Sequence, residues 1–354
     1  MIANRQRRVF LQSAGAGAGA MVLAARSSRA AEPAAVGSTP AAASGSGSHP
    51  LAPTGTPYEI KHGNYKAVVT EVGATLRSFQ VAGVELLDTF GPDEMSRYGM
   101  GQVLAPWPGR VDHGKYTFEG AEQQLPINDV GDQNALHGLV RYRGWKLVDR
   151  GDDVVTLALL LFPTEGYPYA LELAITFRLG EHGLSVHTRA TNVGAHALPL
   201  GLGSHPYFQV GTGALDPATL ILPAATYLPT NARLIPVGRA PVAGTTLDFR
   251  KPKVIGAVKF DTTYTDLVRG KDGRARARLT APGGKRWVEV WMDGNFKYIV
   301  AYSGDTLPVA AHRRRGLCME ALTCAPNAFN SGDGLLTLEP GSHHENDWGL
   351  DGKA

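Results

Sequence analysis

The sequence predicts an all-β protein, and three observations favour this class. Short segments of alternating or β-rich character fill residues 58–350, and turn signals such as Leu-Gly-Glu-His-Gly (179–183) and Pro-Gly-Gly (282–284) separate them. No stretch keeps a helical period with caps over 12 residues, and no repeat of 20–50 residues is evident. Many short, closely spaced strands favour one large β-sandwich or barrel over a βαβ fold.

Eight segments carry the strand pattern most clearly, and we expect each to form a strand or hairpin of a single domain. They cover residues 65–72, 75–87, 115–120, 154–162, 171–179, 184–193, 286–293 and 298–304.

Residues 1–31 have the composition of an export signal. They contain five arginines and no acid, and Arg7-Arg8 precedes Phe10-Leu11 and an Ala/Gly-rich apolar stretch over 14–25. This order resembles a twin-arginine signal. The apolar run is about a dozen residues, short of the ~20 needed to span a bilayer. We therefore expect cleavage, export to the periplasm or the cell exterior, and no membrane span in the mature protein.

Residues 32–57 are rich in Ala, Gly, Ser, Thr and Pro and are predicted to form a disordered linker before the domain at 58–354. Without residues 1–31 the chain has 30 basic and 32 acidic residues, so the sequence gives no indication of a nucleic-acid partner. Cys318 and Cys324 are the only cysteines. They exclude a disulfide-dense scaffold and leave one bridge open. The sequence does not indicate an oligomeric state.

Four polar residues interrupt the β pattern beside glycine or proline, at positions typical of strand ends or loops facing a common cleft. They are Arg110 in "APWPGR", His137 in "NALHG", His205 in "GLGSHPYF" and Glu320 in "GLCMEAL". Taken singly, each has a structural interpretation. The arginine could pair with a carboxylate, and either histidine could be a satisfied core residue. Glu320 must be paired, hydrogen-bonded or functional, and Cys318 would share its face of a strand.

Together and in this order, the motifs resemble the aldose 1-epimerase (galactose mutarotase) family. The resemblance covers residues from about 58 to 350 and rests on "GRVDHGKYTFEG", "NALHG", "SHPYF" and Glu320 followed by "APNAF". It implies a large antiparallel β-sandwich, the supersandwich of that family, with a carbohydrate site on its concave face. It also implies a free aldose such as glucose or galactose as substrate, with no metal or other cofactor.

The resemblance also implies a role for each matching residue. His205 corresponds to the general acid and Glu320 to the general base. His137 corresponds to a second histidine near the sugar ring oxygen. The residues implied to bind or surround sugar hydroxyls are Arg110, Tyr207 and Asp261, the last with Asp266 as a nearby competitor. A carboxylate and an imidazolium suit the reaction, because opening a hemiacetal needs a base at the anomeric hydroxyl and an acid at the ring oxygen.

Departures from the family pattern leave the sugar preference open. Gly109 stands where the family commonly has Asn, and Arg141 and Arg143 follow "HGL" where better-known mutarotases vary. Together with "HRRRG" (312–316), these arginines could recognise a sugar phosphate, although a solvated loop is the preferred interpretation. The tail "GSHHEND" (341–347) is interpreted as a polar strand end. The rival functions are a non-catalytic carbohydrate-binding protein and a lyase or hydrolase on a related β-sandwich. A glycosidase would need two suitably spaced carboxylates.

Overall fold

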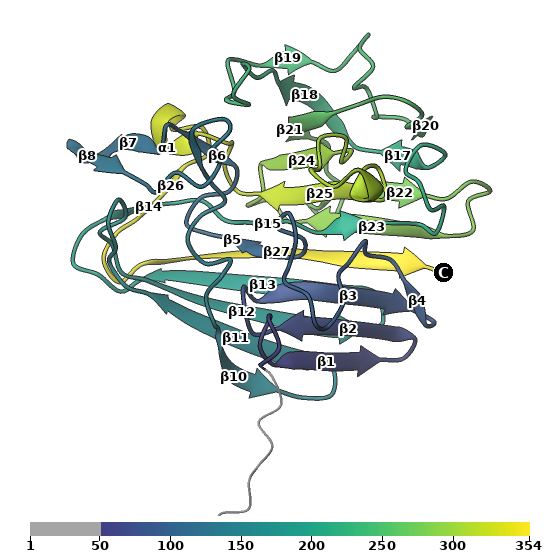
Figure 1. The fold of residues 1–354 in the computed structure, drawn as a ribbon, viewed down its shortest axis with the longest axis horizontal. Coiled ribbons are helices and arrows are strands. Elements are labelled where there is room, and N and C mark those ends of the chain that lie inside the picture. Colours follow the sequence, from purple (N-terminus) through teal and green to yellow (C-terminus); the bar gives the residue numbers. More distant parts are fainter. Residues whose placement is uncertain (1–50) are drawn as a thin grey trace, which may run out of the picture. The chain divides into compact units, whose positions relative to one another are not determined.

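Antiparallel β-strands make up nearly all the regular structure of residues 51–354, the part of the chain that the computed structural model describes (Figure 1). The predicted export signal and most of the predicted linker lie outside these residues. Within the predicted linker, Thr54 is buried, and the first strand begins at Pro57. The predicted all-β antiparallel sandwich is confirmed.

A nine-stranded sheet forms the back layer in Figure 1. Its strands, in spatial order, are β10 (Lys146–Arg150), β11 (Val154–Leu161), β12 (Leu171–Gly180), β13 (Gly183–Asn192), β27 (His343–Lys353), β23 (Trp287–Met292), β22 (Ala275–Thr280), β17 (Thr219–Ile221) and β20 (Lys253–Val254). The strand β12 shows why these segments form sheet. Leu173, Ile175 and Phe177 point into the core. The residues that alternate with them are intermediate or, at Glu172 and Arg178, exposed, which is the two-residue period of a strand with one buried face.

Two further sheets cover the nine-stranded sheet. A four-stranded sheet packs on β11 and β12; its strands are β1 (Pro57–His62), β2 (Tyr65–Thr70), β3 (Thr75–Val81) and β4 (Val84–Glu85). An eight-stranded sheet lies over the half that contains β22 and β23 (Figure 1). Its strands are β19 (Ala240–Pro241), β18 (Ala224–Leu228), β21 (Asp261–Leu267), β24 (Tyr298–Tyr302), β25 (Leu317–Leu322), β15 (Gly203–Ser204) and β5 (Val103–Leu104), with β16 (Tyr207–Phe208) paired to β25.

Short pairs and two single-turn helices complete the described chain. They are β6 (Arg110–Asp112) with β9 (Asn134–Leu136), β7 (Lys115–Phe118) with β8 (Ala121–Gln124), β14 (Leu198–Leu200) with β26 (Leu336–Leu338), the 3₁₀ helix η1 (Ala310–His312) and α1 (Ala328–Ser331). The helix α1 packs on β6 and β7. No helix among the described residues is long and apolar enough to cross a membrane.

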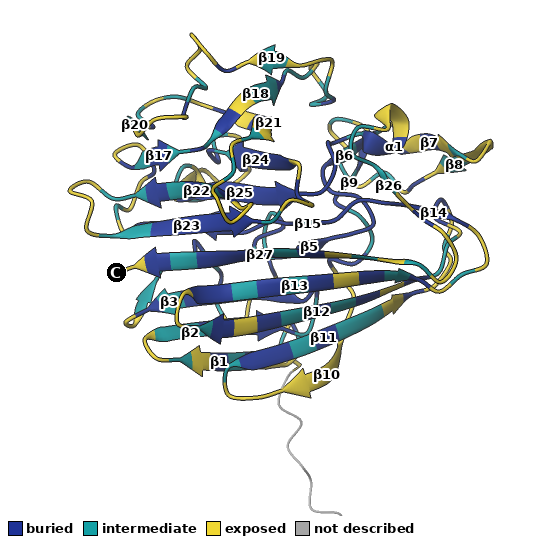
Figure 2. Cartoon of the chain, turned by 180° about the vertical axis from the view of Figure 1, so that it is seen from behind, coloured by how far each residue is buried: buried dark blue, intermediate teal, exposed yellow. Residues whose placement is uncertain are grey.

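The strand β25 separates the core from the opposite face of the eight-stranded sheet. All six of its residues are buried (Figure 2), so its burial does not alternate, but its contacts do. Leu317, Met319 and Ala321 join the main hydrophobic cluster, which also contains side chains of the nine-stranded sheet. Cys318 and Glu320 therefore lie on the other face, which confirms that they share one side of a strand. This second face carries the candidate site.

The strand predictions hold, with one refinement. The segment 75–87 is a hairpin, because β3 and β4 pair across Ala82 and Gly83, both of which have positive φ angles. Cys318 and Cys324 are both free and buried, so the bridge that the sequence left open is not formed.

Candidate active site

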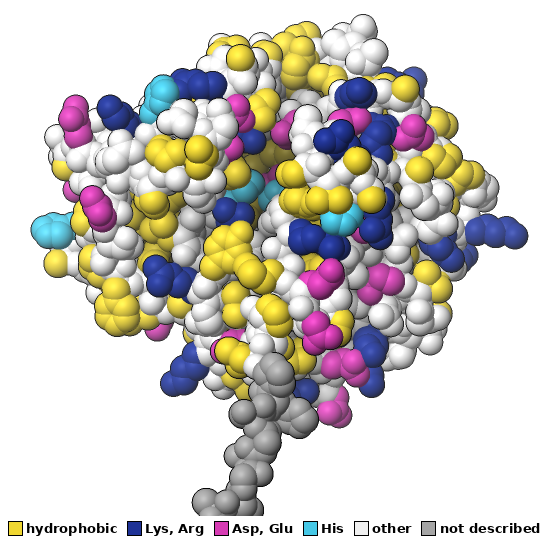
Figure 3. Space-filling view, viewed as in Figure 1, with side chains coloured by type: hydrophobic (Ala, Val, Ile, Leu, Met, Phe, Trp, Pro, Cys, Tyr) yellow, Lys and Arg dark blue, Asp and Glu magenta, His cyan; other side chains and the backbone are white. Residues whose placement is uncertain are grey.

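A pocket of about 540 Å³ opens on the second face of the eight-stranded sheet and is closed on one side by β6 and β9. Figure 3 shows the hollow, with histidine side chains at its floor beside basic and acidic ones. Its lining includes all six residues that the sequence singled out: Arg110, His137, His205, Tyr207, Asp261 and Glu320. The expectation that separate polar motifs face a common cleft is confirmed.

Strand register explains how residues far apart in sequence meet on this floor. Cys318 of β25 pairs with Tyr207 of β16 on one side and with Tyr302 of β24 on the other, and Tyr302 pairs with Asp261 of β21. Two residues along β25, Glu320 pairs with Val300, which pairs with Thr263. Paired residues in neighbouring strands point to the same face, so two rows of side chains form the floor.

His205 lies in the turn between β15 and β16, and the backbone holds it from both sides. Its N–H donates to the carbonyl of Gln102 and its carbonyl accepts from the N–H of Gly101. The ring stacks on Tyr207, with 5.3 Å between the ring centroids. Its Nε2 lies 3.4 Å from Oε1 of Glu320, and its Nδ1 lies 3.3 Å from Sγ of Cys318. The histidine is thus fixed with one nitrogen toward the carboxyl group.

Burial shifts the two partners in opposite directions. His205 is 5% exposed and Glu320 is 4% exposed. Burial raises the pKa of Glu320 to about 8, with the charge of Asp261 adding to the rise. Burial lowers the pKa of His205 to about 3, and the positive charges of Arg141 and Arg110 contribute to the fall. Both shifts favour the uncharged form, as expected in a low-dielectric site. Near neutral pH the free pair therefore holds one proton, on Glu320.

His137 follows β9 in a left-handed conformation, with a φ angle of 60°. Its Nδ1 accepts a hydrogen bond from the N–H of Gly109 at 3.1 Å, so Nε2 carries the proton of the neutral ring. Burial lowers the pKa of His137 well below its usual range, with the charge of His205 adding to the fall. The ring stands edge-on to that of His205, with centroids 4.9 Å apart. His137 is thus a neutral hydrogen-bond donor beside the acid–base pair.

Gly138 is required where it stands. Its φ is 70°, and a Cβ there would lie 1.9 Å from the carbonyl oxygen of Ala105. Only glycine fits this close approach of two backbones, which explains the Gly after His137 in the "LHG" motif.

Two arginines line the pocket, and only one of them forms an ion pair. Arg110 donates from Nε to Oδ2 of Asp129 at 2.9 Å, so its charge is matched. Arg141 is buried, and its side chain donates to the carbonyl of Leu136 at 3.2 Å. The solvated-loop interpretation is wrong for Arg141, because this side chain is buried and lines the pocket near His137. It holds for Arg143, which is exposed.

Of the other residues that the sequence suggested as sugar-binding, only some line the pocket. Asp261 lines the pocket and Asp266 does not, although the two lie on the same strand. In the 312–316 segment, Arg314 pairs with Asp305 and Asp216, and Arg315 pairs with Asp88. None of the arginines at 313–315 lines the pocket. Arg313 and Arg315 are exposed, as the solvated-loop interpretation expects, while Arg314 is partly buried in its ion pairs. The segment is not a substrate clamp.

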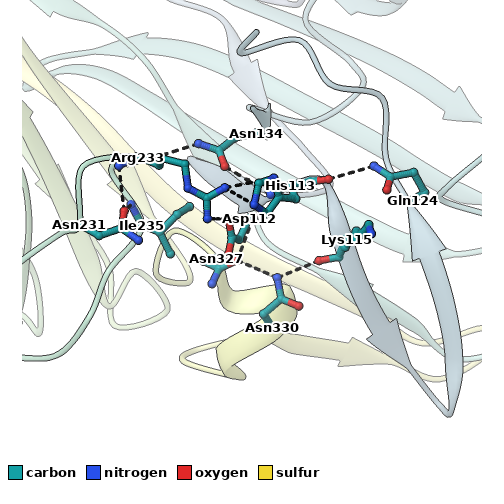
Figure 4. Close-up of polar contacts among 10 residues, drawn as sticks. All are labelled: Asp112, His113, Lys115, Gln124, Asn134, Asn231, Arg233, Ile235, Asn327 and Asn330. Atoms are coloured by element: carbon teal, nitrogen blue, oxygen red, sulfur yellow. Dashed lines mark hydrogen bonds and ion pairs between the residues drawn. The ribbon is translucent and has the colours of Figure 1, made fainter. Parts of the chain in front are cut away.

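A loop over residues 229–237, between β18 and β19, forms part of the pocket wall through Thr230 and Leu234. Figure 4 shows how it is anchored to β6 and β9. Arg233 pairs with Asp112 at 2.6 Å and also contacts His113, and the amide of Asn134 donates to the carbonyl of Arg233 at 3.0 Å. These residues lie outside the sequence motifs, so no local signal pointed to them.

The sequence also did not predict two contacts of the site, one between Arg110 and Asp129 and one between His205 and Cys318. Asp129 has no motif of its own, and only the fold places it beside Arg110. Cys318 was expected on the face of Glu320, but its contact with His205 depends on the pairing of β16 with β25.

His137, His205 and Glu320 offer donor atoms that lie within 4.8 Å of one another. Two neutral imidazoles and a carboxylate are donors that a divalent transition metal accepts. The same three groups form the acid–base cluster described above, and the sequence expectation of a metal-free site stays a prediction.

Comparisons with known proteins bear on the family and the fold. Residues 57–349 match the family model described as aldose 1-epimerase. YihR of Escherichia coli (strain K12), an uncharacterized protein, is 34% identical over 292 residues, covering 82% of this chain and 91% of its own. The galactose mutarotase of Rattus norvegicus is 29% identical over 274 residues, covering 69% of this chain and 76% of its own. A crystal structure of a GalM/aldose epimerase homologue from C. elegans superposes with a TM-score of 0.76 at 18% identity, covering 84% of this chain and 98% of that one.

Proposed function

The chain belongs to the aldose 1-epimerase family, and from that premise we propose that it interconverts the α and β anomers of an aldose by acid–base ring opening and closure. The observation that carries the proposal is the 3.4 Å contact between Nε2 of His205 and Oε1 of Glu320 on the pocket floor. A hemiacetal bears its hydroxyl and its ring oxygen on the same carbon. An acid and a base that serve these two oxygens must therefore stand close together.

The reaction follows from the roles of the pair. In the reactive form of the pair, the shared proton has moved from Glu320 to His205 across their 3.4 Å contact. The Glu320 carboxylate then removes the proton of the anomeric hydroxyl while His205 protonates the ring oxygen, and the bond between C1 and that oxygen breaks. The product is an open-chain aldehyde, with Glu320 protonated and His205 neutral. Rotation about C1–C2 presents the other face of the aldehyde. Closure then reverses both proton transfers and restores the starting state.

The burial of the site supports this cycle. The raised pKa of Glu320 and the lowered pKa of His205 place the single proton of the free pair on Glu320. This is the distribution that the pair has at the open-chain stage. Burial favours the uncharged forms of both His205 and Glu320. It therefore stabilises the open-chain stage, in which both are neutral, relative to the stage with a Glu320 carboxylate and a charged His205. The neutral Nε2–H of His137 adds a donor for a sugar oxygen, and Arg110 and Asp261 add partners for hydroxyls.

The rival functions fit less well. A retaining glycosidase places two carboxyl groups ~5–5.5 Å apart, and an inverting one separates them by ~6.5–9.5 Å. Here the close pair is a histidine and a carboxyl. A protein that only binds sugar needs no such pair.

Polarimetry on freshly dissolved α-glucose and α-galactose tests the proposal. The protein should accelerate the approach to the equilibrium rotation. His205→Asn and Glu320→Gln should each lower kcat by ~10²–10⁴-fold, the usual contribution of a positioned acid or base. Asp266→Asn, on β21 but outside the pocket, is the matched control and should keep the rate. Normal turnover by both pocket variants would refute the assigned roles, and sugar binding without acceleration would favour the binding protein.

We also propose that the leader at 1–31 directs export of this enzyme. The support is the Arg7-Arg8 pair ahead of a weakly apolar, Ala/Gly-rich stretch. Expression of the full chain, cell fractionation and N-terminal sequencing of the product test this proposal. Export and cleavage near Ala30 are expected to be lost in Arg7→Lys/Arg8→Lys. An intact leader on protein that stays in the cytoplasm would contradict the proposal.

A further inference from the structure

Arg141 brings an unmatched positive charge to the pocket. It lines the pocket yet is only 9% exposed. Its guanidinium donates to one neutral acceptor, the carbonyl of Leu136, and lies over the ring of Tyr142 at 5.3 Å from the ring centroid. Its buried Nε has no hydrogen-bond partner among the described residues. Within residues 51–354 no carboxylate lies within ion-pairing distance of it. Buried charges in proteins are as a rule paired, so this arrangement needs an explanation.

The other charged groups of the pocket do not supply the missing partner. The charge of Arg110 is already matched by Asp129. The charges of Glu320 and Arg141 interact, but the two side chains form no ion pair, and burial raises the pKa of Glu320 to about 8. Asp261 and Asp132 also line the pocket, but neither forms an ion pair with Arg141. A hydrogen-bonded counter-charge for Arg141 can therefore be supplied by a molecule that enters the pocket.

The position of Arg141 indicates which part of a sugar it would meet. Its hydrogen bond to Leu136 ties the guanidinium beside His137, whose ring is packed against that of His205. In the proposed reaction His205 serves the ring oxygen, which is bonded to C1 and C5. Glu320 occupies the side of C1. The other carbon bonded to the ring oxygen is C5, so C6 is the substituent that this orientation assigns to Arg141.

We propose that Arg141 recognises an oxyanion carried on C6 of the aldose, so that the preferred substrate is an acidic sugar rather than a neutral one. This inference rests on the proposed mutarotase function and names its substrate class. A planar guanidinium with free N–H donors binds carboxylate or phosphate oxygens in a forked, charge-assisted geometry. The carboxylate of a hexuronic acid and the phosphate of a hexose 6-phosphate share this chemistry.

Anomer exchange measured by NMR on glucose, glucuronic acid and glucose 6-phosphate tests the inference. At least one acidic sugar should exceed glucose in kcat/KM by ~10–100-fold, the range expected when a charged hydrogen bond contributes ~1.5–3 kcal/mol. The faster of the two acids identifies the oxyanion. Arg141→Met, close in length but uncharged, should abolish this advantage, so that kcat/KM falls ~10–100-fold further for the favoured acidic sugar than for glucose. Arg141→Lys should keep part of it. Arg143→Met, two residues on and exposed outside the pocket, should keep the full preference.

Two results would overturn the inference: glucose turning over as well as both acids, or Arg141→Met lowering all three rates equally in a folded protein. Near-UV circular dichroism establishes the fold, and a misfolded Met variant leaves Arg141→Lys to decide. If no sugar is turned over at all, the proposed function fails separately. Calorimetric binding of the two acidic sugars to Glu320→Gln, with and without Arg141→Met, then still decides whether Arg141 holds an oxyanion.

Discussion

His205 and Glu320 share one proton over a wide range of pH, because burial pushes their pKa values apart. The pair would take up a second proton near pH 3 and lose its last one near pH 8. Either change disables the cycle. The doubly protonated pair has no base, and the fully deprotonated pair has no acid. The active species is the one with a single proton, and its population sets the pH dependence of kcat/KM.

The expected profile is flat from about pH 5 to 7 and falls above pH ~8, approaching tenfold per pH unit. Polarimetry of anomer exchange from pH 5 to 10, with the spontaneous rate subtracted, measures it. Glu320→Gln should lose this profile with its activity. A corrected rate that keeps rising to pH 9.5 would show that the pair does not supply the acid.

Cys318 is expected to act through its neighbours as a positioning residue. Its fully buried Sγ lies 3.3 Å from Nδ1 of His205 and 3.8 Å from Oε1 of Glu320. Cys318→Ala removes both contacts and should lower kcat ~5-fold with little change in KM, since one hydrogen bond contributes about 1 kcal/mol.

The pH profile separates positioning from simple loss of packing. The contact with the thiol lowers the pKa of Glu320, so its removal should move the alkaline fall to higher pH. Cys318→Ser, which keeps a donor and acceptor in place, should recover most of the rate and the original profile. An alanine variant with unchanged rate and profile would show that the thiol only fills space.

At the scale of elements, the floor of the pocket is a product of strand register, and the sequence predicted only part of it. Alternation and the Cys318/Glu320 spacing correctly placed both residues on one face of a strand. The pairing of Tyr302 with both Cys318 and Asp261 could not be predicted, because register across β21, β24 and β25 depends on contacts between distant segments. The same holds for the loop at 229–237, which has no motif and reaches the pocket through its anchor on β6.

That anchor should control substrate affinity. Arg233→Ala removes the part-exposed ion pair with Asp112 and frees the loop segment that carries Thr230 and Leu234. A pair of this exposure contributes ~0.2–1 kcal/mol, so KM should rise up to ~5-fold while kcat stays nearly constant. Steady-state anomer exchange measures both constants. Arg250→Ala, which breaks an exposed pair with Asp248 outside the pocket, is the control and should change neither. A fall in kcat alone would mean that the anchor serves the chemistry instead.

For the molecule as a whole, local pattern predicted the fold class, and the order of the motifs predicted which residues meet. His137 follows β9 and His205 lies between β15 and β16, strands of different sheets, and the motifs correctly predicted that both reach one cleft. What remained beyond prediction was the burial state of individual charges. Arg141 and Arg143 are alike in sequence, but the chain buries the first and exposes the second. That difference arises from three-dimensional packing around His137.

The buried acid–base pair should also lower the stability of the folded chain. Glu320 has a pKa of about 8 in the folded state against a usual value of 4.5. A raised folded-state pKa gives a contribution that is fully present below pH 4.5 and is lost as the pH rises toward 8. Near pH 7 most of it is lost, because the unfolded chain ionises Glu320 freely and the folded chain cannot.

Glu320→Gln removes this dependence and should therefore be inactive yet more stable than the natural protein, by about 1–3 kcal/mol at pH 7–8. The difference should shrink toward pH 5, because the pH is then within about half a unit of the pKa of Glu320 in the unfolded chain. Urea unfolding at pH 5, 6, 7 and 8 measures it. Glu339→Gln, an exposed carboxyl outside the pocket, is the control and should change stability little at any of these values. A Glu320→Gln protein that is less stable than the natural one at pH 8 would mean that the ionised carboxylate is well solvated or paired in the folded site. Burial would then not be what keeps a proton on Glu320 in its pair with His205.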